Sequence, residues 1–228
     1  MLKECFENVR KNVPLVHNIT NYVTVNDVAN VLLACGGSPI MSDDIDDVED
    51  ITSICGGLNI NIGTLNKNTI PSMFAAGKKA NSLGHVVLLD PVGAGASKLR
   101  TDTKGVDADV ADKVTDENLD ETIAKLKAFS KATGSIIAVT GAIDLVCDSE
   151  KCYVIRNGRP EMSSITGTGC QLSGMMTAFV VANKENKLEA AAAAVCAMGL
   201  AGEMGFERMQ EGDGNSTYRN RIIDAIYN

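Results

Sequence analysis

The sequence lacks several features that would place it in common classes of protein. No uncharged apolar run reaches the roughly 18 residues of a membrane span, and no signal peptide is recognisable. Basic residues are in the minority, because 21 Lys and Arg face 29 Asp and Glu and leave a net charge of −8. Nucleic acid and anionic membranes are therefore not expected as partners, and any anion must be held by a local site.

Patterns for metal and disulfide binding are scarce as well. The chain has only two histidines, and its seven cysteines are widely scattered with no C-x-x-C pair. A structural zinc site is not expected, and reduced thiols in a cytoplasmic protein are the simplest interpretation. The acidic run at residues 43–50 could hold a metal, but it also fits the first turn of a helix to Cys55, which we expect.

What is present indicates one globular domain over residues 1–228. The length of 228 residues suits a single core, and 45% hydrophobic with 22% charged residues is ordinary globular composition. Neither an internal repeat nor a dividing linker is visible.

Strand and helix patterns alternate from Leu15 to Val139, which predicts a three-layer α/β/α sandwich with a mainly parallel sheet. A hairpin at residues 144–155 should follow. We expect helices at residues 2–11, 24–35, 43–55, 67–83, 115–132 (capped by Thr115), 172–182 and 187–203, with a last short helix after a polar loop at 211–216. Strands are expected at residues 14–19, 38–41, 58–62, 86–89 and 135–139.

Three of the expected strands end in polar turns. These turns lie at residues 18–21, at Gly63-Thr64 and at Asp90. Parallel sheets bind ligands beyond the carboxyl ends of their strands, so the three turns predict the rim of a pocket.

The segment from Ser163 to Gly174 carries most of the chemistry. A Gly-Thr-Gly turn at residues 167–169 enters an apolar helix, whose first amides and positive dipole end can hold a phosphate. An ordinary glycine turn capped by Thr166 or Thr168 remains the alternative. Cys170 lies where a helix start favours the thiolate, although a small buried hydrophobe is the usual role of a free cysteine.

Six motifs, in this order and spacing, resemble those of the hydroxyethylthiazole kinases, a thiamin-salvage family of the ribokinase-like superfamily. The resemblance covers nearly the whole chain. The motifs are Pro14-Leu-Val-His-Asn-Ile-Thr-Asn21, Ser38-Pro-Ile-Met41, Asn61-Ile-Gly-Thr-Leu65, Leu89-Asp-Pro-Val-Gly-Ala-Gly-Ala96, Ala138-Val-Thr-Gly141 and Ile165-Thr-Gly-Thr-Gly-Cys170.

This resemblance implies transfer of the ATP γ-phosphate to the primary alcohol of 4-methyl-5-(2-hydroxyethyl)thiazole with Mg²⁺. It also implies a homotrimer with the active site between subunits. Cys170 stands where most ribokinase-like enzymes carry an aspartate base, and we expect it to orient the alcohol rather than to deprotonate it early. The other implied residues are Met41, Gly167 and Asn21 for substrate, Thr140, Thr168 and Gly169 for ATP, and Asp90 for the metal.

One stretch departs from the family. Between Ala96 and the strand at Ser135 the family has a helix and a strand ending near Arg-Gly-Asn-x-x-Glu, with its ATP-contacting arginine and magnesium-linked glutamate. Here Thr103 passes directly to Lys104, and only about a dozen polar residues follow before the next helix, too few for a crossover. We therefore predict a missing segment at this join, with no normal peptide bond between Thr103 and Lys104.

Two other functions stay open. The chain could phosphorylate another small alcohol, such as a hydroxymethylpyrimidine, although the Met41 region and Cys170 disfavour this. If the deletion is real, it could instead be a non-catalytic protein that binds the thiazole.

Overall fold

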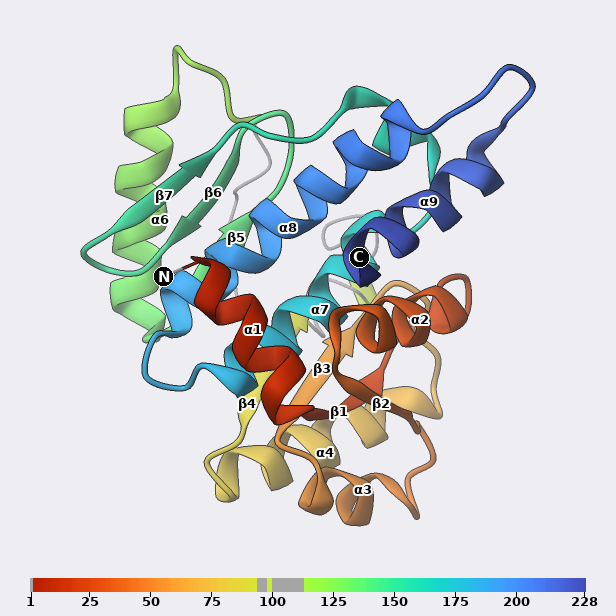
Figure 1. The fold of residues 1–228 in the computed structure, drawn as a ribbon. Helices are drawn as coiled ribbons and strands as arrows, with labels where there is room; N and C mark the ends of the chain where they lie inside the picture. Colours follow the sequence, from red (N-terminus) through yellow and green to blue (C-terminus); the bar gives the residue numbers. More distant parts are fainter. Residues whose placement is uncertain (1, 94–97, 100–112) are drawn as a thin grey trace.

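The computed structural model describes residues 2–93, 98–99 and 113–228. The Thr103–Lys104 join, and the expectation that residues 101–112 are exposed and mobile beside the ATP site, lie outside these residues. A four-stranded parallel sheet forms the centre of the larger part (Figure 1). Its order is β2-β1-β3-β4, from β1 (Leu15–Ile19), β2 (Ser38–Met41), β3 (Gly57–Asn61) and β4 (Val86–Asp90).

A second, three-stranded sheet is antiparallel, with order β5-β6-β7. It comprises β5 (Ile137–Val139), β6 (Asp144–Cys147) and β7 (Cys152–Ile155), so the expected hairpin is confirmed. Among the described residues β5 pairs with β6 and not with β4. No described strand connects β4 to β5, so the two sheets are separate.

Helices cover both faces of each sheet, which confirms the predicted layers. α3 and α4 lie on one face of the parallel sheet, α2 and α7 on the other, while the smaller sheet lies between α6 and α8 (Figure 1). The helices are α1 (Leu2–Asn12), α2 (Val25–Cys35), α3 (Val48–Ile54), α4 (Thr69–Ser82), α6 (Leu119–Thr133), α7 (Thr168–Ala182), α8 (Lys187–Glu207) and α9 (Asn215–Tyr227), with a 3₁₀ turn η1 (Pro160–Ser164).

The hydrophobic core is continuous on the α7 and α8 side and divided on the opposite side. One cluster joins α7 and α8 to strands of both sheets, including Val16 and Val146. On the other side, one cluster lies under α3 and α4 and a separate one under α6. Between them Val87 and Leu89 of β4 are 38% and 44% exposed, which is unusual for a strand in a helix-covered parallel sheet.

Two local expectations were wrong. Thr115 does not cap α6, since that helix begins at Leu119 after Asn118, whose side-chain oxygen accepts the Thr115 backbone N–H at 2.8 Å. The cysteines are not all reduced, because Cys147 and Cys152 form a disulfide. The hairpin register places these two residues directly opposite each other, which cysteine spacing alone does not reveal.

α8 is, among the described residues, the one helix that is long and apolar enough to cross a membrane by length and composition. Some 67% of its most apolar window is buried inside the molecule. It packs against α1, α7 and α9, as the central helix of a core does.

Candidate active site

The start of α7 is built around a glycine that no other residue could replace without strain. Gly167 precedes the helix with a φ of 85°, in the left-handed region. A Cβ at this position would lie 2.0 Å from Cγ2 of Thr24, so the turn packs directly on the start of α2. No side chain in the described part of the chain caps this helix end, so its first amides lack that partner. This arrangement favours the anion site over the capped turn.

Cys170, in the first turn of α7, is buried and its sulfur lies among hydrogen-bond donors. Nδ2 of Asn21 donates to Sγ at 3.0 Å and Nδ2 of Asn61 donates to it at 3.2 Å. Two donors on one sulfur require the sulfur to accept. The thiol is therefore more than a small buried hydrophobe, because both contacts hold it in a fixed position.

Asp90, at the carboxyl end of β4, belongs to the same cluster. Its Oδ2 accepts a hydrogen bond from Nδ2 of Asn61 at 2.7 Å. Burial raises the pKa of Asp90 to about 6, against smaller opposing effects of hydrogen bonds from Ser173 and Asn61. A carboxylate that is partly desolvated in this way gains from a nearby cation.

The side chain of Asn21, which was expected to contact the substrate, contacts other residues of the site. Its amide is directed at Cys170 and at Oδ1 of Asn61, and its own Oδ1 accepts from the Thr24 hydroxyl at 3.0 Å. The structure thus brings together four residues from β3, β4, α7 and the turn after β1. They are Asn21, Asn61, Asp90 and Cys170.

Met41 ends β2 and is held through its neighbour Ser42. The buried ring of His17 donates from Nε2 to the Ser42 carbonyl at 2.9 Å, since a carbonyl can only accept. Nδ1 therefore accepts from the Thr52 hydroxyl at 2.9 Å. Burial lowers the pKa of His17, which keeps the ring in this neutral form.

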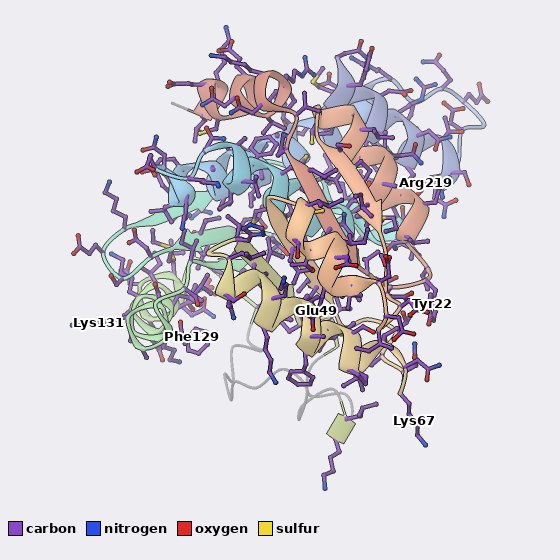
Figure 2. The ribbon with its side chains drawn as sticks, turned by 90° about the horizontal axis from the view of Figure 1, so that it is seen from below. Tyr22, Glu49, Lys67, Phe129, Lys131 and Arg219 are labelled. Carbon is purple, nitrogen blue, oxygen red and sulfur yellow. A yellow bond between two sulfur atoms is a disulfide. The ribbon has the colours of Figure 1, made fainter. Side chains whose placement is uncertain are left out.

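A cleft of about 620 Å³ opens next to this strand end. Its lining comes from the segments after β1, β2 and β3 and from the start of α4, and none of the residues predicted for the rim (18–21, 63–64 and Asp90) is among them. Figure 2 shows Tyr22 and Lys67, two lining residues, on the same side of the molecule. The lining residues are Tyr22, Asp43, Asp44, Ile45, Asn66, Lys67, Asn68, Thr69 and Pro71.

The expected ATP-binding residues lie on separate elements of the fold. Thr168 and Gly169 form the first turn of α7, where Gly169 is exposed and has open space around it. Thr140 is exposed directly after β5, in the smaller sheet.

A magnesium ion would need waters and phosphate oxygens, in addition to protein side chains, to be held at this site. Within the described part of the chain, no group of three or more His, Cys, Asp or Glu side chains could enclose a metal. Mg²⁺ in phosphoryl-transfer sites usually keeps waters and phosphate oxygens and uses one or two carboxylates. Asp90, partly buried and at the strand end, fits that role.

Sequence reasoning missed Asn61 as a functional residue. The segment Leu58–Ile62 alternates apolar and polar residues, which predicts a strand with one solvent-facing side. In the structure β3 is buried along its whole length, and Leu58 and Ile60 pack into the cluster under α4. The polar face of β3 was the available signal, because Asn61 on it reaches the site.

Fold and site together define a class: a ribokinase-like α/β phosphotransferase, in which Asn61 connects the glycine-rich helix start to a strand-end carboxylate. The sequence profile described as Hydroxyethylthiazole kinase family matches residues 6–105 and 101–228. The chain belongs to the hydroxyethylthiazole kinase family.

Individual relatives agree with this placement. Hydroxyethylthiazole kinase of Clostridium acetobutylicum is 57% identical over 258 aligned positions, covering 100% of this chain and 94% of that protein. The protein of the same name from Ruminiclostridium cellulolyticum is 45% identical, with 96% and 89% covered. The structure of hydroxyethylthiazole kinase from Pyrococcus horikoshii has a TM-score of 0.89 at 33% identity, covering 99% of this chain and 92% of that one.

Proposed function

We propose that this chain transfers the γ-phosphate of ATP to the primary alcohol of 4-methyl-5-(2-hydroxyethyl)thiazole. The observation that carries the proposal is the cluster at the strand ends, where Asn61 connects Cys170 at the α7 start to Asp90. Cys170, the amides of the α7 start and the Asp90 carboxylate are groups of the kind that serve phosphoryl transfer, and their connection through Asn61 supports the proposal.

In the proposed reaction the alcohol oxygen forms a bond to the γ-phosphorus while the bond from that phosphorus to the bridging oxygen of ADP breaks. Cys170 orients the alcohol, whose proton passes to Sγ only late, after the bond to phosphorus has begun to form. The amides of the Gly167–Cys170 turn hold negative charge on the transferred phosphoryl group. When bound, Mg²⁺ neutralises phosphate charge, and Asp90 with phosphate oxygens and water would hold it.

The remaining roles follow from position. We assign Met41, Gly167 and Asn21 to the thiazole, since they surround the ends of β1 and β2 and the α7 turn. Thr140, Thr168 and Gly169 are assigned to ATP, whose length could bridge the two sheets. Asn21 then acts on the substrate mainly through Cys170.

We also propose that the natural protein carries a further segment at Thr103–Lys104. The family profile matches in two pieces that divide at this place, and the 258-position alignment is longer than the 228 residues of the chain. The exposed Val87 and Leu89, between two separated core clusters, are what removal of a covering helix and strand would leave.

The proposed assembly is a homotrimer in the cytoplasm. Large apolar side chains stand exposed next to the cleft, with Tyr22 at 63%, Val23 at 65% and Ile45 at 48%. Exposed apolar groups gathered at one site favour an interface with another protein chain. A subunit boundary there would close the cleft from outside.

One alternative has an observation in its favour. If the deletion at Thr103–Lys104 is real, the exposed residues of β4 are a consequence of it. Such a protein would bind the thiazole but transfer phosphate poorly, because it lacks the family's arginine and glutamate. A hydroxymethylpyrimidine kinase is the less favoured alternative, since Cys170 replaces the residue usual in that group.

Calorimetry and intact mass separate these cases. The thiazole alcohol should give heat of binding, and a pyrimidine alcohol should not; the reverse result would overturn the substrate. The mass of the protein from its natural source should lie clearly above 24.0 kDa. A mass of 24.0 kDa together with thiazole binding would instead support the non-catalytic alternative.

A further inference from the structure

The side chain of Asn61 uses all of its hydrogen-bonding capacity inside the site. Its Nδ2 donates one hydrogen to Asp90 Oδ2 at 2.7 Å and the other to Cys170 Sγ at 3.2 Å. Its Oδ1 accepts from Asn21 Nδ2 at 3.1 Å and from the Gly63 backbone N–H at 2.9 Å. An asparagine offers two donors and two lone pairs, so every position is occupied.

This occupation fixes the orientation of the amide. A flipped amide would turn its oxygen toward the Asp90 carboxylate and its nitrogen toward the Gly63 N–H, which replaces attraction with repulsion at both places. The side chain is also only 1% exposed, so water cannot take over either role. Asn61 is therefore held in one state by its surroundings.

We propose that Asn61 is a positioning residue for phosphoryl transfer, whose single amide nitrogen holds Cys170 as the proton acceptor and Asp90 at a fixed place beside it. The inference deepens the proposed function and rests on the roles given there to Cys170 and Asp90. Asn21 adds the second donor to the sulfur. Both donors fix the position of the sulfur relative to Asp90.

A matched control lies two residues earlier on the same strand. Asn59 is 0% exposed, and its Nδ2 donates at 3.1 Å to Oδ1 of Asn18 rather than to Cys170 or Asp90. Asn59→Asp and Asn61→Asp thus remove the same group from the same buried strand. Only the second removes a donor from the sulfur and places negative charge next to it.

The test is the rate at which iodoacetamide alkylates Cys170 at neutral pH, followed peptide by peptide by mass spectrometry. Because the thiolate is the nucleophile, Asn61→Asp should slow alkylation about tenfold or more, the effect of losing one hydrogen bond to a charged group. In the same variant kcat should fall at least about tenfold while KM for the thiazole changes less than about threefold. Asn59→Asp should leave the alkylation rate within about twofold of wild type.

Two results would overturn the proposal: a wild-type alkylation rate in Asn61→Asp, or equal slowing in Asn59→Asp. If Asn61→Asp does not fold, Asn61→Ser carries the same test. If neither folds, ¹⁵N labelling of asparagine in the wild-type chain decides, since two side-chain amide signals must shift when Cys170→Ala is introduced, and fewer would contradict the contacts. An unchanged kcat in Cys170→Ala would instead contradict the proposed function, while the alkylation rates still report on Asn61.

Discussion

At the scale of single residues, the site depends on backbone conformations and buried contacts that few other residue types permit. Gly167 combines a φ of 85° with Thr24 Cγ2 at 2.0 Å from any added Cβ. Gly169, two residues later, has nothing within 4 Å of such an atom. Backbone conformation and packing therefore require a glycine at position 167, whereas packing does not require one at position 169.

Gly167→Ala should lower the free energy of unfolding by at least about 2 kcal/mol, from left-handed strain plus overpacking against α2. Urea denaturation measures it. Gly169→Ala is the control and should leave stability unchanged or slightly raised, because alanine suits a helix better than glycine. Equal losses in both variants would mean that the turn does not adopt this conformation.

Asp90 predicts a pH dependence with a definite sign. Burial raises its pKa to about 6 from 3.8. Between these values the folded chain keeps a proton that the unfolded chain has released, so the contribution of Asp90 to the free energy of unfolding falls as pH rises from about 4 to about 6. Ionised Asp90 therefore destabilises the metal-free protein at neutral pH.

Asp90→Asn removes this contribution. Compared with wild type in metal-free buffer, the variant should gain about 2 kcal/mol of relative stability between about pH 4 and about pH 7, discounting the shift for partial exposure. Comparing the two proteins at each pH cancels other titrating groups, including His17. A difference that stays constant with pH would contradict the buried environment of Asp90.

Much of the residue-level site could be predicted from the sequence, because glycine turns and strand-end carboxylates have local signatures. For Asn61 the polar face of β3 was the one sequence signal, and its partners on β4 and α7 could not be predicted from it. The orientation of the Asn21 amide toward Cys170 likewise depends on contacts between residues far apart in the chain. Such contacts leave no local pattern.

At the scale of elements, most strands and helices appear where periodicity predicts them, and β2 matches residue for residue. The start of α6 was misplaced because Thr115 and Asn118 are both good capping types, and only the packing of α6 decides between them. The disulfide was missed because cross-strand pairing depends on hairpin register rather than on cysteine spacing.

The hairpin gives a countable prediction. Chain denatured in excess iodoacetamide without reductant should take up five carbamidomethyl groups, and seven after reduction, because Cys147 and Cys152 are paired. Lysis in the presence of the reagent guards against later oxidation. Cys147→Ser should free Cys152, so this variant should take up six carbamidomethyl groups without reduction. Seven groups on the unreduced wild type would show that Cys147 and Cys152 are not paired in the cell.

At the scale of the whole molecule, the layered α/β fold was predictable because alternating strands and helices allow few other arrangements. The separation into two sheets was visible only as a shortage of residues near Thr103–Lys104. How subunits associate was not predictable from residue patterns, since the exposed Tyr22, Val23 and Ile45 become one patch only after folding.

The proposed trimer can be tested through that patch. Sedimentation should give about three times the chain mass at micromolar concentration, and Val23→Glu should dissociate it by burying a charge at the interface. Leu83→Glu, at an exposed leucine directly after α4, is the control and should remain a trimer. Wild-type monomer, or dissociation of the control alone, would contradict an interface beside the cleft.

Phosphorylation of a thiazole alcohol by this chain is measured most directly by ³¹P NMR of the chain with ATP, Mg²⁺ and equal amounts of the thiazole and pyrimidine alcohols. We expect a new phosphate-ester signal on 4-methyl-5-(2-hydroxyethyl)thiazole, matched by ADP, and greatly reduced in Cys170→Ala. A phosphate ester on the pyrimidine alcohol, or ADP with free phosphate and no ester, would contradict it.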